Sequence, residues 1–527
     1  MTAHLLSILI FLPLAGAAAV LLLPETAKKN AYRLTLVISV IALLICLYLY
    51  SGFDKEAIGY QFLEQKDWIN LELGSLGAIH IQYLLGLDGI SLPMVLLAGI
   101  VFLVATISSH SIAKRTKAYF SFYLLLMSSV FGCFVSLDFF LFFLFFEFML
   151  LPMYFLIGIW GGERREYAAM KFIIYTLVGS VFILIVMLAM GLSVTDNPLS
   201  TELGKNIFSF DFRILSDASN YISGSVLDAK ASNSLFGWPA KTVLFVLLLI
   251  GFGIKLPTVP FHTWLPDAHV EAPTAISVVL AGILLKVGGY AFLRIGIGFF
   301  PTEAFDMAYV IAGLGVLSIV FGAFNALAQD DLKKLIAYSS VSHMGFVFLG
   351  FAAFNEQGIN GGIYQMFSHG ILSAMLFLIV GVVYDRTGNR LIQNYRGLAS
   401  KMPLFTGVVV IAFFGSLGLP GLSGFIGEFF SLLGAFNAPT LPLWLPSLAV
   451  LGIILSAIYL LWALQRMFFG EFWVNRSLQN EMTDLSQREK IMLFGLAVLA
   501  ILFGVWPNLI FEVSHGAVDT FLSSTAK

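Results

Sequence analysis

Long apolar runs separated by short polar segments dominate the chain. Because a transmembrane helix needs about 20 predominantly apolar residues, each run predicts one span of a membrane. Runs of this kind lie at 4–23, 33–51, 88–110, 118–136, 139–160, 168–192, 241–265, 272–298, 306–329, 333–354, 360–384, 404–434, 447–469 and 489–510. The pattern therefore predicts an all-α, polytopic membrane protein with about 14 transmembrane helices.

The basic residues predict how the helices are oriented. No basic residue precedes the first run, whereas Lys28, Lys29 and Arg33 follow it. This order favours a retained helix over a signal peptide, with its N-terminus on the periplasmic side. Most basic residues of the later loops then fall on the cytoplasmic side. An even number of helices places the C-terminus on the periplasmic side as well.

Two periplasmic segments are longer than simple turns. Residues 52–87 contain an alternating stretch from Ile79 to Tyr83, which predicts a short hairpin. Residues 193–240 are rich in Ser, Asn, Asp and Gly, which predicts an irregular cap over the helices.

Two of the apolar runs contain helix-breaking residues. One reads GFGIKLPTVPFHTWLPDAH and the other GSLGLPGLSGFIGEFF. Proline removes a backbone donor and clashes with the preceding turn, so neither stretch can remain a regular helix. Non-helical backbone at this depth persists only inside protein or beside water. The breaks fall in the seventh and twelfth runs, which predicts two inverted five-helix repeats, helices 4–8 and 9–13.

This arrangement divides the chain into four parts. We expect N-terminal helices with an external hairpin at 1–110 and a first repeat at 111–300, which includes the external loop 193–240. A second repeat is expected at 301–475 and a C-terminal helix at 476–527.

Composition supports a membrane protein and excludes several functions. The chain has 527 residues, of which 59% are hydrophobic and only 11% charged, against about 25% charged in soluble proteins. The net charge of −2 provides no basic stripe for nucleic acid. Cys46 and Cys133 both lie in apolar runs, which excludes a disulfide framework, a zinc site built on cysteines and iron–sulfur ligation. No motif for a nucleotide, flavin or haem is present.

Three charged residues lie inside apolar runs, namely Glu147, Lys255 and Lys286. A charge at membrane depth costs at least a few kcal/mol. A chain that retains an acid and two bases there is expected to use them to move protons or ions. The alternatives are a protonated structural acid at Glu147 and structural counter-ions at the two lysines.

His343, His369 and Glu428 add further polar groups to the later runs. Neutral imidazole accepts a proton on one nitrogen and donates from the other, so the two histidines could relay protons through neighbouring hydroxyls and water. Each could instead be an ordinary packing histidine. Glu428, after the second break, would be the last member of this series.

His262, Asp267, His269 and Glu271 form a cluster near the cytoplasmic face with some metal-ligand character. Their spacing matches no strong zinc motif, and a proton entry site or a helix-capping role explains them better. Asp138, at the outer edge, is expected to be an ordinary surface charge.

Three segments resemble the antiporter-like membrane subunits of respiratory complex I, the proton-pumping NADH–quinone oxidoreductase. They are GLDGIS at 86–91, KLPTVPFHTWLPDAHVEAPTAISVVLAGILLKVGGY and DLKKLIAYSSVSHMGF. The likeness runs from about residue 84 to 475 and implies fourteen helices, inverted repeats and a polar axis through the membrane. It also implies a coupled pair (Glu147, Lys255), a central lysine (Lys286), two relay groups (His343, His369) and a terminal proton residue (Glu428).

Two features indicate the M type among the family's siblings. At the position of Glu428, the similar L-type and N-type subunits have lysine. The chain also stops soon after the last predicted helix, whereas L-type subunits continue into a long lateral helix.

The resemblance implies a proton-translocating subunit of a bacterial inner-membrane enzyme, without a cofactor or metal of its own. NADH, FMN, iron–sulfur clusters and quinone would belong to partner subunits, and L-type and N-type subunits and the peripheral arm would be its neighbours. The alternatives are a subunit of an Mrp-type cation/proton antiporter or of a membrane-bound hydrogenase, and a purely structural spacer.

Overall fold

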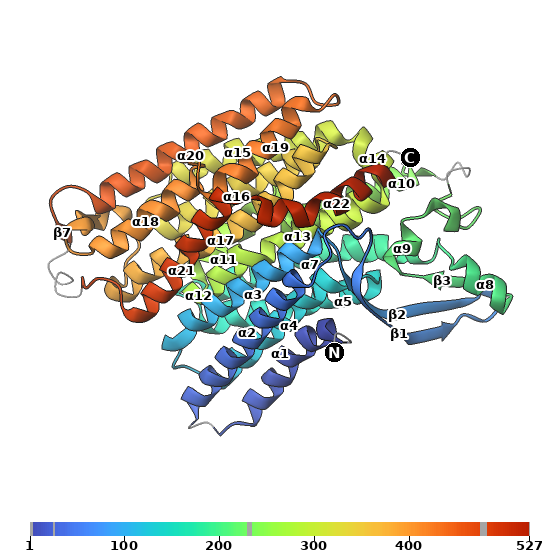
Figure 1. The fold of residues 1–527 in the computed structure, drawn as a ribbon, viewed down its shortest axis with the longest axis horizontal. Helices are drawn as coiled ribbons and strands as arrows, with labels where there is room; N and C mark the ends of the chain where they lie inside the picture. Colours follow the sequence, from blue (N-terminus) through green and yellow to red (C-terminus); the bar gives the residue numbers. More distant parts are fainter. Residues whose placement is uncertain (1–3, 25–26, 229–233, 475–481, 526–527) are drawn as a thin grey trace.

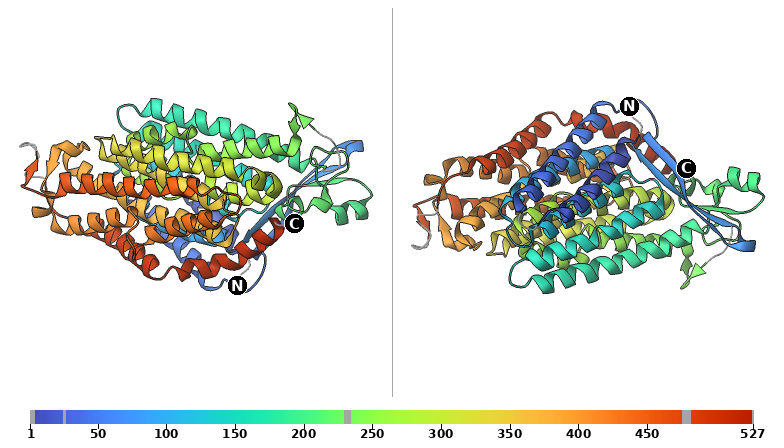
Figure 2. Two further views of the ribbon diagram at one scale, coloured as in Figure 1. Left: turned by 90° about the horizontal axis from the view of Figure 1, so that it is seen from above. Right: turned by 90° about the horizontal axis from the view of Figure 1, so that it is seen from below.

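Long helices lie side by side in a flattened bundle, with a β-hairpin projecting from one end (Figure 1). The computed structural model describes residues 4–24, 27–228, 234–474 and 482–525. Figure 2 shows the C-terminal helices along one long edge and the helices of residues 150–190 along the opposite edge. Both ends of the described chain lie toward the end that carries the hairpin (Figure 1).

Helices occupy every predicted span. They are α1 (Leu5–Leu22), α2 (Lys28–Ser51), α3 (Ser91–Ser108), α4 (Thr116–Val135), α5 (Phe139–Phe148) with α6 (Leu150–Trp160), α7 (Arg165–Gly191), α10 (Ala240–Lys255) with α11 (Trp264–Glu271), α12 (Thr274–Val279) with α13 (Leu285–Ala291), α15 (Ala308–Leu327), α16 (Leu332–Phe351), α17 (Glu356–Thr387), α18 (Pro403–Ser416) with α19 (Ser423–Asn437), α20 (Trp444–Phe468), and α21 (Gln487–Val505) with α22 (Asn508–Thr525). The multi-helix, membrane-type fold is therefore confirmed.

Length and composition alone identify fewer spans than the apolar pattern predicts. Among the described residues, ten helices are long and apolar enough to cross a membrane, or eleven if the bent pair α21–α22 is one span. The other predicted spans, 241–265, 333–354 and 404–434, coincide with α10 and α11, α16, and α18 and α19, which fall outside that criterion. The count of fourteen stays a prediction. The four-part division also stays a prediction, and its boundary at 475/476 lies outside the described residues.

The first predicted break lies between α10 and α11. Its backbone groups find partners inside the protein, as non-helical backbone at membrane depth requires. Thr258 N donates to Gly253 O at 2.8 Å, and Val259 N donates to Ser318 Oγ at 3.0 Å. The Trp264 indole donates to Ile254 O at 2.8 Å and so fixes α11 against the end of α10.

The second predicted break lies between α18 and α19. Gly418 and Gly421 have φ values of +80° and +92°, a region that favours glycine. The carboxylate of Glu428 lies so close that a Cβ at Gly418 would be 3.0 Å from Glu428 Oε2. In Figure 1, α10 begins at the hairpin end whereas α18 begins at the opposite end, as inverted repeats require.

The predicted hairpin is present and longer than expected. Strands β1 (Gln61–Glu72) and β2 (Ala78–Leu87) pair antiparallel, and β3 (Ile207–Ser209) adds to β2 in parallel. The expected cap at 193–240 is partly regular, and its residues 229–233 lie outside the description. It contains α8 (Asn197–Leu203), α9 (Phe212–Leu215), β4 (Ser234–Leu235) and β5 (Trp238–Pro239). The remaining short elements are α14 (Pro301–Asp306), β6 (Tyr395–Arg396) and β7 (Trp473–Val474).

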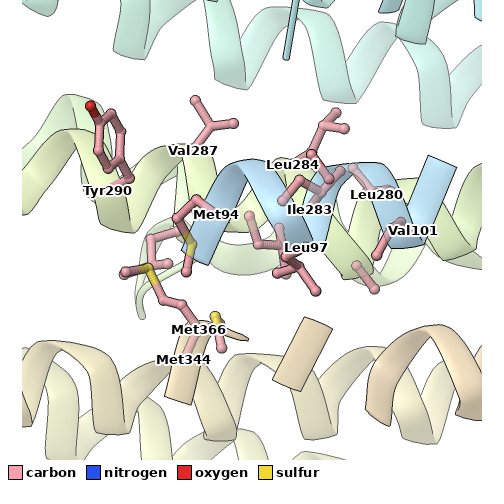
Figure 3. Packing of buried hydrophobic residues seen from close by; sticks show 14 of the residues in the cluster. Met94, Leu97, Val101, Leu280, Ile283, Leu284, Val287, Tyr290, Met344 and Met366 are labelled. Carbon is pink, nitrogen blue, oxygen red and sulfur yellow. The ribbon is translucent and has the colours of Figure 1, made fainter. Parts of the chain in front are cut away.

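The centre of the bundle consists of two helical spans that are shielded from lipid. An 18-residue window of the span 274–297 and one of α17 are fully buried, whereas only 39% of the corresponding window of α7 is buried. Figure 3 shows the packing there, where Leu97 and Val101 of α3 meet Ile283 and Leu284, with Met366 of α17 nearby. Charged side chains on these central spans are therefore held within protein.

Asp138 corrects one expectation. Its side chain is fully buried and caps α5, accepting hydrogen bonds from Leu141 N at 3.0 Å and from Gln82 N at 3.2 Å. The prediction of an ordinary surface charge is wrong, because the hairpin folds back over the start of α5 and covers this carboxylate.

The GLDGIS segment contains a buried ion pair. Asp88 Oδ1 accepts hydrogen bonds from Ile90 N and Ser91 N at the start of α3, and Asp88 Oδ2 is bound by the guanidinium of Arg294. The Arg294 guanidinium also lies 5.5 Å from the centre of the Tyr60 ring. This pair ties α3 to the end of the central span 274–297.

We expect Asp88→Asn to lower the free energy of unfolding by about 3–5 kcal/mol, because it leaves the Arg294 charge buried without a counter-ion. Thermal unfolding of the purified protein in detergent measures this loss. The exposed pair of Lys55 and Glu512, 2.6 Å apart, provides the control, since Glu512→Gln should cost no more than about 1 kcal/mol. Equal losses in the two variants would contradict the prediction.

Candidate functional site

Glu147 lies near the end of α5, just before the chain passes into α6. Its Oε1 has no hydrogen-bond partner, and Ser180 of α7 and the Lys255 ammonium lie near the carboxylate. An apolar groove of about 830 Å³ reaches Glu147 from outside the bundle, between α1, α5 and α7. Glu147 is therefore accessible from a neighbouring lipid or protein surface.

Lys255 is the last residue of α10, directly at the first break. The side chain is 98% buried, and its Nζ has no hydrogen-bond partner. Instead the ammonium lies 5.1 Å from the centre of the Phe146 ring and 5.7 Å from that of Phe172. Ring faces attract cations. Glu147 and Lys255 are therefore neighbours, as predicted, but no ion pair within 4.0 Å joins them.

Lys286 and His369 meet at the centre of the bundle. Lys286 Nζ and His369 Nδ1 are 2.7 Å apart, and Lys286 Nζ also donates to Ala281 O. A π-helical turn at Leu280–Leu284 precedes the lysine, and turns of this type occur frequently at functional sites. An ammonium donates and has no acceptor, so His369 Nδ1 is the acceptor when Lys286 is charged.

His343 and Glu428 continue the line from His369. The ring centres of His343 and His369 are 5.7 Å apart, and His343 Nδ1 lies 2.7 Å from Glu428 Oε1. The four side chains come from α13, α17, α16 and α19 in that order along the line. The structure therefore brings together four of the six predicted site residues, and Glu147 and Lys255 form a separate group.

A small cavity is lined in part by both histidines. Its volume of about 10 Å³ is close to what one water molecule needs. His343, His369, Glu428, Gln365 and Ser368 contribute to its lining. His343 Nε2, Gln365 Oε1 and Glu428 Oε2 are buried without hydrogen-bond partners, so the cavity is polar enough to hold water.

The serines that precede His343 in the sequence do not join this line. Ser339 Oγ accepts a hydrogen bond from the Tyr459 hydroxyl at 3.0 Å, and Ser340 Oγ donates to Ile336 O. Ser423 of α19, which the sequence did not single out, binds Ser368 at 2.9 Å instead.

The predicted cluster at 262–271 lies toward the end of the bundle opposite the hairpin, and its side chains do not point to a common site. Asp267 binds Lys171 at 2.6 Å, Glu271 Oε2 accepts from Arg164 N at 3.0 Å, and His269 stacks on Phe377 with the ring centres 4.4 Å apart. The ring of His262 packs against Phe321. The four side chains therefore have separate partners, which is compatible with the predicted helix-capping role, and their polar atoms do not meet at one point.

Lys333 is a buried charge that sequence reasoning missed. Its ammonium donates to the backbone oxygens of Ala272 and Val270 at the end of α11, and the residue is only 5% exposed. The sequence shows it beside Lys334 at the start of a span, and nothing in that pattern distinguishes the two lysines.

Residues 136–456 match the protein family described as NADH:quinone oxidoreductase/Mrp antiporter, transmembrane. The chain is 42% identical to NADH-quinone oxidoreductase subunit M of Rhodobacter capsulatus over 519 residues, which are 97% of this chain and 94% of that protein. The chain belongs to the subunit M family of NADH-quinone oxidoreductases. It is also 40% identical to subunit M of Rickettsia bellii, with 98% of each chain covered. The predicted resemblance to complex I subunits of the M type is thus confirmed.

Solved structures agree with this membership in the subunit M family. A chain of respiratory complex I from Thermus thermophilus with bound NADH superposes with a TM-score of 0.81 at 29% identity, and 99% of each chain is covered. The Mrp complex from Dietzia contains a chain that matches with a TM-score of 0.79 at 20% identity, which shows a shared fold only. The roles of the six site residues stay predictions.

Proposed function

We propose that this subunit M family member carries protons across the membrane through Lys286, His369, His343 and Glu428, driven by quinone reduction in partner subunits. The observation that supports this most strongly is the line of contacts at 2.7 Å, 5.7 Å and 2.7 Å between four buried side chains, which begins on the two central spans whose apolar windows are fully buried. Replacing buried ionic groups by well-packed apolar residues is often neutral or stabilising, so stability alone does not account for four ionisable side chains in one buried row.

The chemistry of the row suits proton transfer. Lys286 can donate to His369 Nδ1, and neutral imidazole can release a proton from its other nitrogen. One water in the cavity would connect the two rings, since their centres are too far apart for a direct hydrogen bond. His343 then exchanges a proton with Glu428, which lies beside the break between α18 and α19.

Glu147 and Lys255 are proposed to act as the switch that drives the row. The ammonium is held by ring faces in the separated state, and a change of side-chain conformation would bring it to the carboxylate. Two unit charges 4 Å apart attract by about 4 kcal/mol at an effective dielectric constant of about 20. An energy of that size changes a protonation equilibrium by about a thousandfold.

The partners follow from the same proposal. The redox groups, which are NADH, FMN, iron–sulfur clusters and quinone, reside in other subunits. L-type and N-type subunits and the peripheral arm are the proposed neighbours in a bacterial inner membrane. The two ends of the described chain lie toward the hairpin end (Figure 1), which supports the proposal that both termini are periplasmic.

Copurification in mild detergent tests the proposed function against the antiporter and hydrogenase alternatives. We expect peripheral flavin and iron–sulfur subunits and NADH-dependent quinone reduction to accompany a tagged chain. Copurification with small Mrp-type subunits, without flavin, would overturn the proposal in favour of a cation/proton antiporter. Copurification with a nickel-containing subunit would favour a membrane-bound hydrogenase.

We expect Glu428→Gln to reduce proton translocation severalfold, because an amide cannot take up the proton that His343 passes to it. Translocation is measured with a pH-sensitive dye in liposomes that contain the complex, at equal amounts of assembled enzyme. Glu202→Gln, at an exposed position of the short helix α8, removes an acid elsewhere and should have no effect. Translocation at the wild-type rate in the Glu428 variant would reduce this residue to a packing role.

A further inference from the structure

Three potential metal ligands converge at the hairpin end of the bundle, away from the proton row. They are Glu356 in the first turn of α17, and His515 and Asp519 on α22. Their ligand atoms all lie within 4.8 Å of one another. Helix α22 was not predicted, since the last apolar run ends at residue 510. It follows α21 after a bend of 60°.

The two separations from the His515 nitrogen fit a tetrahedral ion better than they fit hydrogen bonds. His515 Nδ1 is 3.4 Å from Glu356 Oε1 and 3.4 Å from Asp519 Oδ2, which is long for a hydrogen bond to a carboxylate. Zinc binds imidazole nitrogen and carboxylate oxygen at about 2.0–2.2 Å, so two ligands of a tetrahedron stand about 3.3–3.6 Å apart. A metal ion could enter with small rotations of the side chains.

The two helices hold these ligands in place. His515 and Asp519 are four residues apart and therefore share one face of α22. One residue before His515, Ser514 Oγ donates to Asn360 Oδ1 at 2.7 Å, and both side chains are buried. Asn360 lies one turn after Glu356 on α17. This buried contact fixes the distance between the helices next to the three ligands.

The local charge also favours a cation. Lys55 approaches α22, but its ammonium binds Glu512 at 2.6 Å. Among the described residues, neither Glu356 nor Asp519 has a lysine or arginine within 4.0 Å, and the imidazole of His515 is the partner of both. With a neutral imidazole, the site presents two negative charges to solvent, since all three side chains are exposed.

We propose that Glu356, His515 and Asp519 form a binding site for a divalent transition metal, best suited to Zn²⁺, that links α22 to α17. One nitrogen and two carboxylate ligands leave a fourth position for water, as zinc sites with three protein ligands do. Calcium takes six to eight oxygen ligands, so it fits this site poorly. An ion bound here would join the C-terminal helix to the helix that carries His369.

Equilibrium dialysis of the intact, detergent-solubilised complex against radiolabelled Zn²⁺ tests the site, after loosely bound metal has been removed with a chelator. The wild type should hold one more zinc ion per chain than His515→Ala. Glu356→Gln and Asp519→Asn should each lower the affinity for that zinc ion at least about tenfold. Even residues that only hydrogen-bond to metal ligands contribute about 10–100-fold to metal affinity. His515→Cys should retain the ion, because thiolate is a good zinc ligand.

The matched control is His4→Ala. His4 is also exposed and lies 3.7 Å from a single carboxylate, that of Glu64, so its loss should leave the zinc count unchanged. Equal zinc counts in wild type and His515→Ala would overturn the proposal, and so would equal loss in His515→Ala and His515→Cys. Because dialysis requires no turnover, the result does not depend on whether the proton row functions as proposed.

Discussion

Replacing Glu147 by glutamine is expected to lower proton translocation at least about tenfold while leaving the complex assembled. Groups that exchange protons in the rate-limiting step commonly contribute about 10²–10⁴-fold. Glutamine keeps the size of the side chain, but it has no charge to attract the Lys255 ammonium and cannot bind or release a proton. NADH-driven acidification of liposomes, corrected for the amount of assembled complex, measures the loss. Quinone reduction should fall with it if the two processes are coupled.

Two further variants make this first prediction decisive. Lys255→Ala removes the other half of the proposed switch and should cause a loss of similar size. Glu163→Gln removes an acid from an exposed loop segment and should leave translocation unchanged. Wild-type translocation in both Glu147→Gln and Lys255→Ala would refute the proposed roles of the pair.

Lys286→Met is expected to abolish translocation through the row without destabilising the protein. Methionine fits a site for a long side chain, but it gives His369 Nδ1 no donor and provides no proton. A buried ammonium is costly to desolvate, and Lys286 has no carboxylate within 4.0 Å among the described residues. The free energy of unfolding should therefore stay equal or rise. Liposome acidification and thermal unfolding are measured on the same preparation.

This pair of measurements separates a functional lysine from a structural counter-ion. A structural role predicts that Lys286→Met lowers the free energy of unfolding, and a proton-transfer role predicts that it lowers translocation alone. Lys114→Met, on an exposed loop segment, is the control and should change neither quantity. Loss of stability together with retained translocation would contradict the proposed role of Lys286.

The location of the charges explains how the membrane tolerates them. Lys286 and His369 lie on the two central spans, whose apolar windows are fully buried. Neighbouring helices therefore take the place of lipid around both residues, and backbone oxygen and imidazole accept the hydrogen bonds of the ammonium. Glu147 is different, because its groove opens to the outside of the bundle. A neighbouring subunit could change the environment of Glu147 while the rest of the row stays enclosed.

Much of the fold could be predicted from local patterns. Each apolar run correctly predicted helical structure where it lies, because lipid requires about 20 apolar residues per crossing. The proline and glycine clusters located both breaks, since their effect on a helix is local. The hairpin was predicted too short, because only the stretch from Ile79 to Tyr83 alternates clearly. Helix α22 was missed, since its sequence mixes polar and apolar residues and predicts no span.

The buried polar contacts were harder to predict, because they join residues far apart in the chain. Asp138 resembles a loop charge until the hairpin covers it. Lys333 and Lys334 are indistinguishable until α11 packs over one of them. The pairing of Ser368 with Ser423 depends on how α17 packs against the start of α19. Contacts of this kind follow from helix packing, which leaves no mark in any single segment.

The sequence by itself determined that this is a multi-span membrane protein with two broken helices and six ionisable groups inside apolar runs, because a charged residue within an apolar run is costly to bury and is therefore easily recognised. Only the tertiary structure decided that four of these groups form one row and that Glu147 and Lys255 stand apart. It also decided that Glu356 meets His515 and Asp519. Distances between side chains on different helices depend on how the helices pack, and the pattern of apolar residues does not specify that packing.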